Sequence, residues 1–512
     1  MRDPIQIPLI ETESSWAPPS LLPDLTRATE IAVDLETRDP NLLLLGPGWA
    51  TNDGEVVGVS IATNDWSGYL PFKHEAGGNL DKGFVMAWLK KQMDSPADKV
   101  FHNSLYDVGW LKREGIEIQG KIQDTMIAAP LINENRHRYS LDSLGFEYCG
   151  ERKDETLLKQ AAREWGVNPK AEMWKLPSKY VGPYAEQDAV LTLKLWNKMK
   201  AVLEKQNLTK IYALESGILP LLIEMRWRGI KIDQDKAQKT MEQLKVKEEQ
   251  TIQQIKKDYG YEIDLWAAAS LAKVFEKNSL TYPRTERTNA PSFTAEWLEG
   301  HSHPLPQGIV KARRLNKLRT TFIEKMIFGH MRNGKIHGQI NPLRSDSGGT
   351  VSGRFSYSSP NLQQVPARDP ELGRLVRDLF IPDGQEYWGA FDYSQQEPRI
   401  TVHYAALTKQ LGAEDAVEAY QDQDADFHQI VADMAGIDRK KAKTINLGLS
   451  YGMGKQKLTQ ALDIPGPEAE ALFAQYHRKV PFIRGLSNSC MRRASNKGFI
   501  TTLLGRKCRF NM

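Results

Sequence analysis

The chain of 512 residues is too long for one hydrophobic core, and its length predicts two to four domains. Its composition, 40% hydrophobic and 26% charged, is that of a soluble globular protein, and no apolar run approaches the ~20 residues that span a bilayer. Three widely separated cysteines exclude a disulfide framework and a zinc site, and with no signal-peptide pattern they favour a reducing, cytoplasmic setting.

The charge of the chain is distributed unevenly. Nine of the 68 basic residues but none of the 64 acidic residues lie after Glu470, so the formal charge of +4 becomes −5 for residues 1–470. A basic end on an acidic body predicts that this end contacts a polyanion. A solvated surface is the alternative, because most short basic runs have no partner.

The first 200 residues alternate strand-like and helix-like segments. Residues 30–37 and 55–63 are predicted strands, and residues 188–206 are a predicted helix. This alternation is typical of an α/β domain. From about residue 205 the pattern becomes helical, and residues 236–260 are expected to form a long solvated helix with a thin apolar seam.

The last part of the chain mixes turns, strands and helices. Residues 341–371 form a polar, turn-rich stretch that is too long for an idle connector. A strand pair is predicted around Asp392, followed by helices. The final segment is expected to be a hairpin that turns at Gly505 and Arg506.

Acidic residues in the first 200 positions predict a divalent-metal site. In the first predicted strand Asp34 and Glu36 share one face, which we expect to be exposed, while Asp107 and Asp188 come from helical segments. Such carboxylates would bind two Mg²⁺ or Mn²⁺ ions, and two neighbouring metal ions can activate water for attack on a phosphodiester. Tyr184, one helical turn before Asp188, would orient that water or help to deprotonate it. Each motif taken singly is more often structural.

A second constellation lies on a predicted helix that begins at Arg439. Arg439, Lys443, Leu447 and Tyr451 recur every four residues and therefore share one face. Two cations followed by an aliphatic side chain and a ring suit a nucleoside triphosphate, because the cations meet phosphate oxygens and the other two meet sugar and base. An amphipathic surface helix with Leu447 and Tyr451 in the core explains the pattern equally well.

Taken together, these segments resemble the family A DNA polymerases, which include DNA polymerase I and its phage relatives. Residues 392–400 (DYSQQEPRI) match motif A, and residues 439–452 match motif B. Residues 352–366 match the family's stretch around the primer–template junction. The carboxylate motifs, with a tyrosine in the third, resemble the family's 3′→5′ proofreading exonuclease domain.

The resemblance implies a multidomain protein of α/β and α+β parts, with an RNase H-like exonuclease domain ahead of a polymerase right hand. It implies an exonuclease domain at residues 1–204, a helical thumb at 205–340, the first part of the palm at 341–407, and helical fingers at 408–512 that begin the return to an incomplete palm. It also implies Mg²⁺ as cofactor, two ions per active site with Mn²⁺ as a substitute. The implied partners are a primed DNA template and dNTPs, with no membrane.

The resemblance also implies roles for residues of the polymerase site. Asp392 would bind the catalytic Mg²⁺ ions, Tyr393 would add its backbone carbonyl, and Glu397 would reject a ribose 2′-hydroxyl. Lys443 would act with its neighbours on the triphosphate and stabilise the leaving pyrophosphate. The other residues expected to contact the nucleotide, the templating pair or the minor-groove side of the new base pair are Arg439, Gln395, His428, Leu447, Tyr451 and Arg354.

Two features depart from the family. Leu447 stands where Phe or Tyr is usual, so we expect altered discrimination against modified sugars. Motif C, a Val-His-Asp-Glu element that supplies the second metal carboxylate, is missing, since the sequence contains no His-Asp-Glu triplet and its last acid is Glu470. We therefore expect that the chain is truncated before motif C and that another polypeptide carrying motif C completes the site.

Three functions remain open from the sequence. The first is a template-directed DNA polymerase with 3′→5′ proofreading that is completed by another segment. The second is a stand-alone 3′→5′ exonuclease whose polymerase remnant binds DNA, and the third is a non-catalytic DNA-binding factor, which would need none of the acids. The short region before residue 31 has no room for a 5′ nuclease domain, which favours a phage or mobile-element source and the host cytoplasm.

Overall fold

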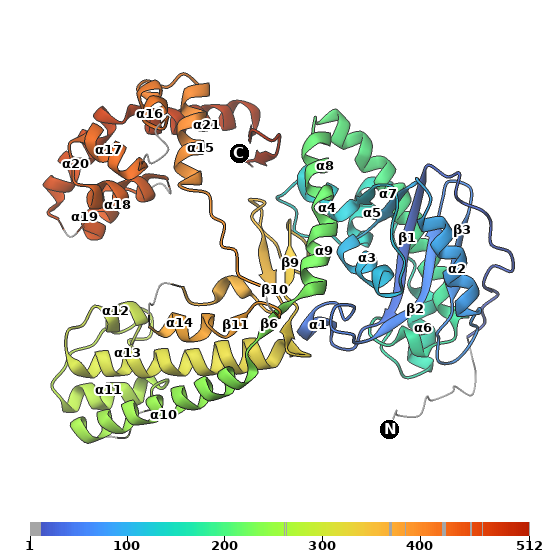
Figure 1. Cartoon of the computed structure of the whole chain (residues 1–512), viewed down its shortest axis with the longest axis horizontal. Coiled ribbons are helices and arrows are strands. Elements are labelled where there is room, and N and C mark those ends of the chain that lie inside the picture. The colour runs from blue at the N-terminus through green and yellow to red at the C-terminus, as the bar shows by residue number, and fades with distance from the viewer. Residues whose placement is uncertain are drawn as a thin grey trace. The chain divides into compact units, whose positions relative to one another are not determined.

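The computed structural model of the chain describes residues 12–510 except 261, 263, 368–370, 385, 422–425, 451, 452 and 463, and omits the side chains of residues 434, 435, 447, 449 and 450. The chain divides into two compact units, Met1–Trp388 and Gly389–Met512, and each is considered by itself (Figure 1). Among the described helices, none is long and apolar enough to cross a membrane.

A five-stranded mixed sheet forms the centre of the N-terminal part. Its spatial order is β3-β2-β1-β4-β5, with β1, β4 and β5 parallel and β2 and β3 antiparallel to their neighbours. Figure 1 labels β1, β2 and β3 of this sheet. The strands are β1 (Glu30–Arg38), β2 (Glu55–Ala62), β3 (Ser67–Pro71), β4 (Asp98–Phe101) and β5 (Ile122–Asp124). The predicted α/β character of this region is confirmed.

Helices cover the sheet on both sides. They are α1 (Leu42–Leu45), α2 (Lys82–Met93), α3 (Ser104–Arg113), α4 (Thr125–Ile132), α5 (Leu141–Cys149), α6 (Thr156–Glu164), α7 (Ser178–Lys205), α8 (Thr209–Gly217) and α9 (Leu219–Arg228), with a 3₁₀ turn at Met173–Lys175. The long helix α7 contacts β1, β2, β3 and β4. Its buried residues recur at helical spacing and include Ala185, Ala189, Leu193, Trp196, Met199 and Leu203.

Side chains of β1 alternate between two faces, as predicted. Ile31 and Val33 pack into one apolar cluster with residues of α2 and α3, whereas Ala32 packs into another with residues of α4 and α7. The face that carries Asp34 and Glu36 is not exposed, contrary to our expectation, because α7 lies across it. A central strand with helices on both sides of its sheet is buried on both faces.

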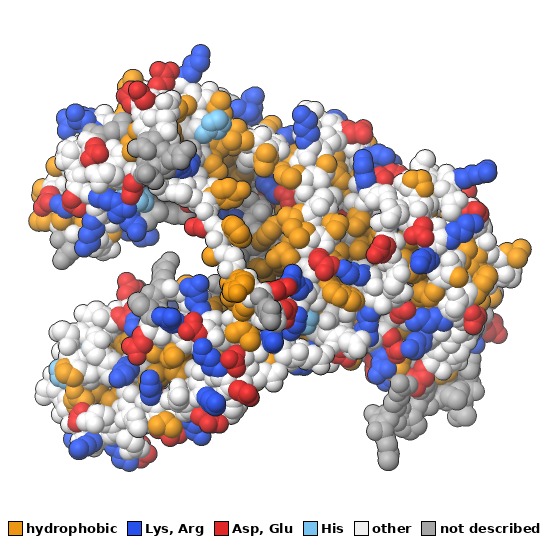
Figure 2. Space-filling model, in the orientation of Figure 1, with side chains coloured by type: hydrophobic (Ala, Val, Ile, Leu, Met, Phe, Trp, Pro, Cys, Tyr) orange, Lys and Arg blue, Asp and Glu red, His pale blue; other side chains and the backbone are white. Residues whose placement is uncertain are grey.

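A helical arm follows in the same unit. Its helices are α10 (Gln234–Tyr259), α11 (Ala268–Lys277), α12 (Ala295–Glu299), α13 (Pro304–Lys317) and the π-helical segment Leu318–Phe328. The predicted long helix is confirmed as α10, which starts at the cap Asp233 and ends at Gly260 with φ +68°. Leu244 and Ile255 in its seam are buried against neighbouring helices including α13, while charged side chains cover the outer surface (Figure 2).

Short strands join the base of the arm. They are β6 (Ile230–Ile232), β7 (Met331–Arg332), β8 (Lys335–Ile336) and β11 (Phe380–Ile381), which form an antiparallel sheet in the order β11-β6-β8-β7. The polar stretch predicted as turns contains β10 (Ser356–Ser358), which pairs with β9 (Gln339–Asn341) in a second small ladder, and a 3₁₀ turn at Leu362–Gln364. Helix α14 (Leu372–Arg377) follows the stretch.

The second unit is mainly helical. Its elements are α15 (Gln396–Leu407), α16 (Ala413–Ala419), α17 (Phe427–Ala435), α18 (Arg439–Ser450), α19 (Lys455–Leu462), α20 (Gly466–Lys479), α21 (Pro481–Lys497), β12 (Phe499–Thr501) and β13 (Lys507–Arg509). The core contains Phe427, Ile445, Tyr476 and Phe482. The predicted terminal hairpin is confirmed, with β12 paired to β13 and Gly505 at φ +94° in the turn.

The predicted strand pair around Asp392 is wrong. Residues 386–393 have no strand structure, and none of the described strands pairs with them. A β-strand needs a neighbour for its backbone N–H and C=O groups, and apolar, β-prone residues such as those of the sequence YWGAF do not supply one.

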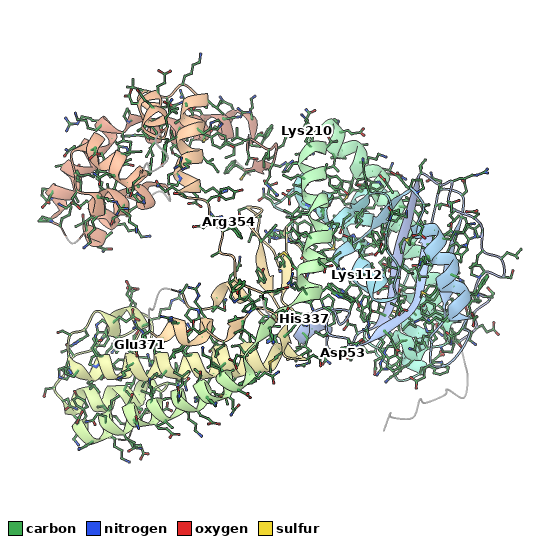
Figure 3. The ribbon with its side chains drawn as sticks, viewed as in Figure 1. Asp53, Lys112, Lys210, His337, Arg354 and Glu371 are labelled. Atoms are coloured by element: carbon green, nitrogen blue, oxygen red, sulfur yellow. The ribbon has the colours of Figure 1, made fainter. Side chains whose placement is uncertain are left out.

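One buried cation joins the sheet domain to the base of the arm. The guanidinium of Arg226 donates from Nη1 to the carbonyl of His337, and from Nη2 to the carbonyls of Leu45 (3.0 Å) and Pro47 (2.9 Å). Nδ1 of His337 lies 2.8 Å from the Arg226 carbonyl oxygen, and Figure 3 labels His337 near the end of α9. Three backbone carbonyls thus depend on one side chain.

We expect Arg226→Met to lower the free energy of unfolding strongly, because each buried carbonyl left without a donor costs about 1–3 kcal/mol. Thermal unfolding of the full chain, followed by circular dichroism, measures the effect. Arg228→Met is the matched control, since the Arg228–Glu386 pair is more than half exposed and such pairs contribute at most ~1 kcal/mol. Equal melting temperatures for the two variants would contradict the structural role of Arg226.

Candidate active sites

Three carboxylates meet beneath helix α7. Asp34, Glu36 and Asp188 each offer one oxygen atom, and these atoms lie within 4.8 Å of one another. Asp34 and Glu36 come from β1, two residues apart and therefore on the same face, whereas Asp188 comes from α7. The packing of α7 on β1 thus brings together three carboxyl groups that would repel one another if all were ionised.

The fourth predicted acid lies beside this cluster. Asp107, on α3, is buried, and its Oδ1 accepts a hydrogen bond from the Leu35 backbone N–H at 3.1 Å. Leu35 separates Asp34 from Glu36, and burial, followed by the charge of Asp34, raises the pKa of Asp107. Asp107 is not among the three groups within 4.8 Å, but its hydrogen bond with Leu35 places it beside β1, the strand that carries Asp34 and Glu36.

Tyr184 and Asp188 lie one turn apart on α7, as predicted, and share an unpredicted partner. Nζ of Lys153 donates to the Tyr184 hydroxyl at 2.7 Å and to Asp188 Oδ2 at 2.5 Å. Lys153 lies in the charged sequence ERKDE between α5 and α6, which has the composition of an ordinary solvated loop. No periodicity or motif in the sequence marks it.

Burial and mutual repulsion raise the pKa values of the clustered carboxyls. Burial, and secondarily the charge of Asp188, raises the pKa of Asp34 to about 7, against the opposing effect of Lys153. The pKa of Glu36 lies well above its ordinary value for the same reasons, and burial also raises the pKa of Asp188. Burial and nearby carboxylates raise the pKa of Tyr184 as well, so its phenol stays protonated near neutrality.

In the second unit, α17 and α18 gather several of the predicted nucleotide contacts. Oδ2 of Asp426 accepts hydrogen bonds from Arg439 Nε (2.9 Å) and Nη2 (2.5 Å). The pKa of His428 is lowered, first by burial and then by the nearby charges of Arg439 and Lys443, although Asp426 opposes the shift. Arg439 and Lys443 therefore lie close enough to His428 for their charges to act on it, beside the carboxylate of Asp426.

Asp426 was missed from the sequence although it carried a signal. Its side chain caps α17 by accepting from the His428 and Gln429 backbone N–H groups, and Asp immediately before a helical pattern is a typical N-cap. The pairing with Arg439 across thirteen residues had no such signal.

The other predicted polymerase residues are more dispersed. Gln395 precedes α15 at φ +53°, and its Oε1 accepts from the Phe427 backbone N–H (2.5 Å) and the Tyr420 hydroxyl (3.3 Å). Asp392 and Tyr393 are exposed in a segment without regular structure, and Glu397 is exposed in the first turn of α15.

Three further predicted contacts complete the account. Arg354, labelled in Figure 3, is exposed just before β10 in the first unit, and the Thr350 hydroxyl donates to its carbonyl at 2.7 Å. The Leu447 side chain and the whole of Tyr451 lie outside the described residues.

Comparison with known families assigns both halves of the chain. Residues 13–204 match the 3′-5′ exonuclease domain, and residues 234–512, more than half of the chain, match DNA polymerase family A. The chain belongs to the family A DNA polymerases. It is a DNA-directed DNA polymerase with a 3′→5′ exonuclease domain, and the resemblance drawn from the motifs is confirmed.

Individual relatives of this polymerase come from phages and bacteria. It is 38% identical to a DNA-directed DNA polymerase of Pseudomonas phage M6 (99% of this chain and 85% of that protein), and 31% identical to DNA polymerase DpoZ of Acinetobacter phage SH-Ab 15497 (95% and 83%). It is 28% identical to DNA polymerase I of Pseudomonas aeruginosa (95% and 53%).

A solved structure confirms the fold. The polymerase domain of Pol1 from M. smegmatis, in complex with DNA primer-template and dNTP, superposes with a TM-score of 0.74 over 96% of this chain and 81% of that chain, at 22% identity. The predicted combination of an exonuclease domain with a polymerase domain of mixed α/β structure is therefore confirmed.

The carboxylate cluster of the polymerase suits a divalent cation. Enzymes with these domains generally depend on divalent metal, and carboxylate oxygens are the ligands that Mg²⁺ and Mn²⁺ prefer. Asp188 Oδ1 is buried and accepts no hydrogen bond from the described residues. A buried carboxylate oxygen without a donor beside two further acids fits an ion in this place.

We expect the affinity of the polymerase for Mn²⁺ to rise roughly tenfold between pH 6 and pH 8, because an ion must displace the proton that Asp34 holds with a pKa of about 7. The metal-free protein should correspondingly lose stability as the pH rises through 7, since its folded state binds this proton more tightly than the unfolded chain. Electron paramagnetic resonance of free Mn²⁺ measures the affinity. An affinity that is constant from pH 6 to pH 8 would contradict the raised pKa.

Proposed function

We propose that Asp34, Glu36, Asp107 and Asp188 form the editing site, which removes nucleotides from a primer 3′ end. The observation that carries the proposal is the convergence of these acids from β1, α3 and α7, with three of them offering oxygens within 4.8 Å. A fold that only binds DNA has no use for buried acids, because they oppose the phosphate backbone and destabilise the protein.

The roles within this site follow from the neighbours of each side chain. The four carboxylates would hold two Mg²⁺ ions, which supply Lewis acidity to water and to the leaving oxygen when bound. Tyr184 remains a protonated phenol, so it would orient the attacking water rather than take its proton. Helix α7, which packs on β1, closes the site on one side.

We propose that the other half performs template-directed nucleotidyl transfer. Its parts would be a thumb at residues 205–340, the first part of a palm at 341–407 and fingers at 408–512, behind an exonuclease domain at 1–204. Asp392 and the Tyr393 carbonyl would hold the ions. Glu397 would gate the sugar.

The fingers would supply the contacts to the incoming dNTP. Arg439 and Lys443 would bind the triphosphate, and Lys443 would stabilise the pyrophosphate, because both cations lie near His428 at α17 and α18. His428 and Gln395 would lie near the nucleotide, Leu447 and Tyr451 beside sugar and base, and Arg354 at the minor groove. Binding of dNTP requires Arg439 to exchange Asp426 for phosphate.

We propose that the second metal carboxylate of the polymerase site is supplied by a polypeptide segment outside these 512 residues, carrying motif C. The 512 residues contain no His-Asp-Glu triplet. Tyr387 (94%), at the end of the first unit, and Phe391 (97%) and Tyr393 (79%), at the start of the second, are exposed, and another polypeptide would cover such rings.

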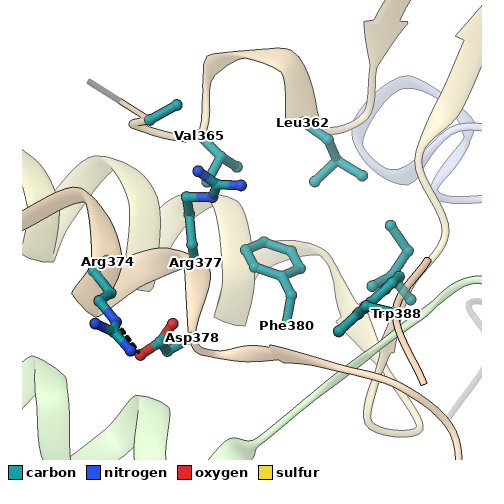
Figure 4. Close-up of a pocket in the computed structure, with 9 residues that line it drawn as sticks. Leu362, Val365, Arg374, Arg377, Asp378, Phe380 and Trp388 are labelled. Atoms are coloured by element: carbon teal, nitrogen blue, oxygen red, sulfur yellow. Dashed lines mark ion pairs between the residues drawn. The ribbon is translucent and has the colours of Figure 1, made fainter. Parts of the chain in front are cut away.

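An apolar pocket of the first unit supports the same proposal. Its volume is about 680 Å³, and Leu362, Val365, Phe380 and Trp388 line it (Figure 4). An ion pair between Arg374 and Asp378 lies at one side. Strand β11, which contains Phe380, is the edge of its four-stranded sheet, and such an edge can accept a further strand.

We propose that the polymerase works in the cytoplasm of a bacterial host. Its relatives include polymerases of phages and of bacteria. Its three cysteines are free thiols, which a reducing compartment preserves.

We expect Asp34→Ala to reduce 3′→5′ exonuclease activity on the order of 10³-fold, because loss of a metal carboxylate removes several kcal/mol of transition-state stabilisation. A 5′-labelled primer annealed to a template, incubated with Mg²⁺ but no dNTP, measures shortening. Asp24→Ala is the matched control in the same domain, since the Asp24–Lys91 pair is exposed. Persistent shortening by Asp34→Ala would overturn the editing site.

With all four dNTPs present, the purified 512-residue chain should shorten the primer and not extend it. Addition of a polypeptide that carries a Val-His-Asp-Glu strand should produce extension, which Asp392→Ala and replacement of the added aspartate should each abolish. Extension by the chain alone that depends on Asp392 would refute the proposed second segment. Failure of every such polypeptide to restore extension would favour a stand-alone exonuclease.

A further inference from the structure

Lys153 is a nearly buried cation whose contacts belong to the proposed editing site. Its side chain is 13% exposed and that of its ion-pair partner Asp188 is 6% exposed. The ammonium bonds both Asp188 and Tyr184, and it lies 4.3 Å from the centre of the Tyr184 ring. One side chain from a loop therefore fixes two functional groups that lie a helical turn apart.

The loop around Lys153 is held on both sides by hydrogen bonds. The Lys153 backbone N–H donates to Asp142 Oδ1 on α5 at 3.1 Å. On α7, Gln187 accepts from the Asp154 N–H at 2.7 Å and donates to the Arg152 carbonyl at 3.1 Å. Gln187 directly precedes Asp188, so the same turn of α7 that carries the acid also anchors the loop. A surface lysine of a solvated loop has no such support.

The charge of Lys153 acts on the whole carboxylate cluster. It lowers the pKa of Asp34, of Glu36 and of Asp188, against the burial that raises all three. It occupies only one oxygen of Asp188, because Oδ1 accepts no hydrogen bond from the described residues. The cluster therefore has one positive charge of its own and still presents a carboxylate oxygen towards Asp34 and Glu36.

We propose that Lys153 is a positioning residue of the exonuclease reaction, a built-in cation that holds Asp188 and Tyr184 in place and offsets the carboxylate charge before divalent ions bind. The inference rests on the proposed editing site and adds a residue to it. A divalent ion that enters the cluster meets the Lys153 ammonium as a like charge. The lysine thus keeps the empty site folded and at the same time limits how tightly the site binds metal.

The first test compares Lys153→Met with Lys194→Met in the full chain. Lys194 is also paired, through Glu151, but this pair on the surface of α7 is nearly half exposed. In EDTA we expect Lys153→Met to melt several degrees below wild type, and saturating Mn²⁺ should raise its melting temperature more than it raises that of wild type. Mn²⁺ paramagnetic resonance at pH 8.5 should show about tenfold tighter binding. Lys194→Met should match wild type in each measurement.

The second test separates positioning from general destabilisation. Exonuclease kcat should fall for Lys153→Met and for Tyr184→Phe. The double variant should be no slower than the slower single variant, since Lys153 acts on the Tyr184 hydroxyl as well as on Asp188 and Tyr184→Phe removes only that hydroxyl. KM for primed DNA should stay unchanged. Lys153→Arg keeps the positive charge, so in EDTA it should melt at the wild-type temperature even if its hydrogen bond to the Tyr184 hydroxyl is poorly aligned.

The outcomes distinguish this inference from the editing site itself. If wild type gains no stability from Mn²⁺ and Asp34→Ala remains active, the editing site is wrong. If wild type gains stability and Lys153→Met gains the same amount, with fully additive losses of kcat, the editing site stands and the role of Lys153 is refuted.

Discussion

Repulsion among buried carboxylates is the constraint on which the N-terminal half depends. Asp34, Glu36 and Asp188 can lie within 4.8 Å of one another only if protons, metal ions or a fixed cation reduce their charge. The packing of α7 over β1 buries Glu36 and Asp188 and partly buries Asp34, and the removal from water raises the pKa values of all three. Repulsion among these carboxylates destabilises the metal-free fold, and the same repulsion favours the binding of a divalent metal ion.

The two halves of the polymerase treat their acids in opposite ways. The acids of the proposed exonuclease site come from regular elements on both sides of a packed interface, so their geometry exists before substrate arrives. Asp392 stands in an exposed segment with no strand on either side among the described residues. We propose that a further segment completes the polymerase site, whereas the proposed editing site would need only ions and a primer end.

Local patterns predicted what depends on local structure. The alternation of Ile31 to Glu36, the single helical turn between Tyr184 and Asp188 and the hairpin at Gly505 each follow from backbone periodicity or turn chemistry. The exposed face expected for Asp34 and Glu36 was wrong, because the helix that covers it begins about 140 residues later in the sequence. Strand-like residues around Asp392 were misread because β-propensity cannot supply a pairing partner.

Lys153 and Asp426 show the limit of residue-type reasoning at the sites. Motif patterns name the groups that act on substrate, but not the counter-charges that hold them, since a lysine in a charged loop and an aspartate before a helix are common everywhere. Only the folded chain brings Lys153 to Asp188 and Asp426 to Arg439.

The hydrogen bonds from the Arg226 guanidinium to three backbone carbonyls decide where this polymerase can be truncated. A fragment cut after residue 204 would keep the whole sheet and all four acids, yet the carbonyls of Leu45 and Pro47 would lose their donor. Both carbonyls lie between β1, which carries Asp34 and Glu36, and β2, at the end of α1 and just after it. An autonomous nuclease made from this chain should therefore extend through α9, and preferably through the strands that carry His337.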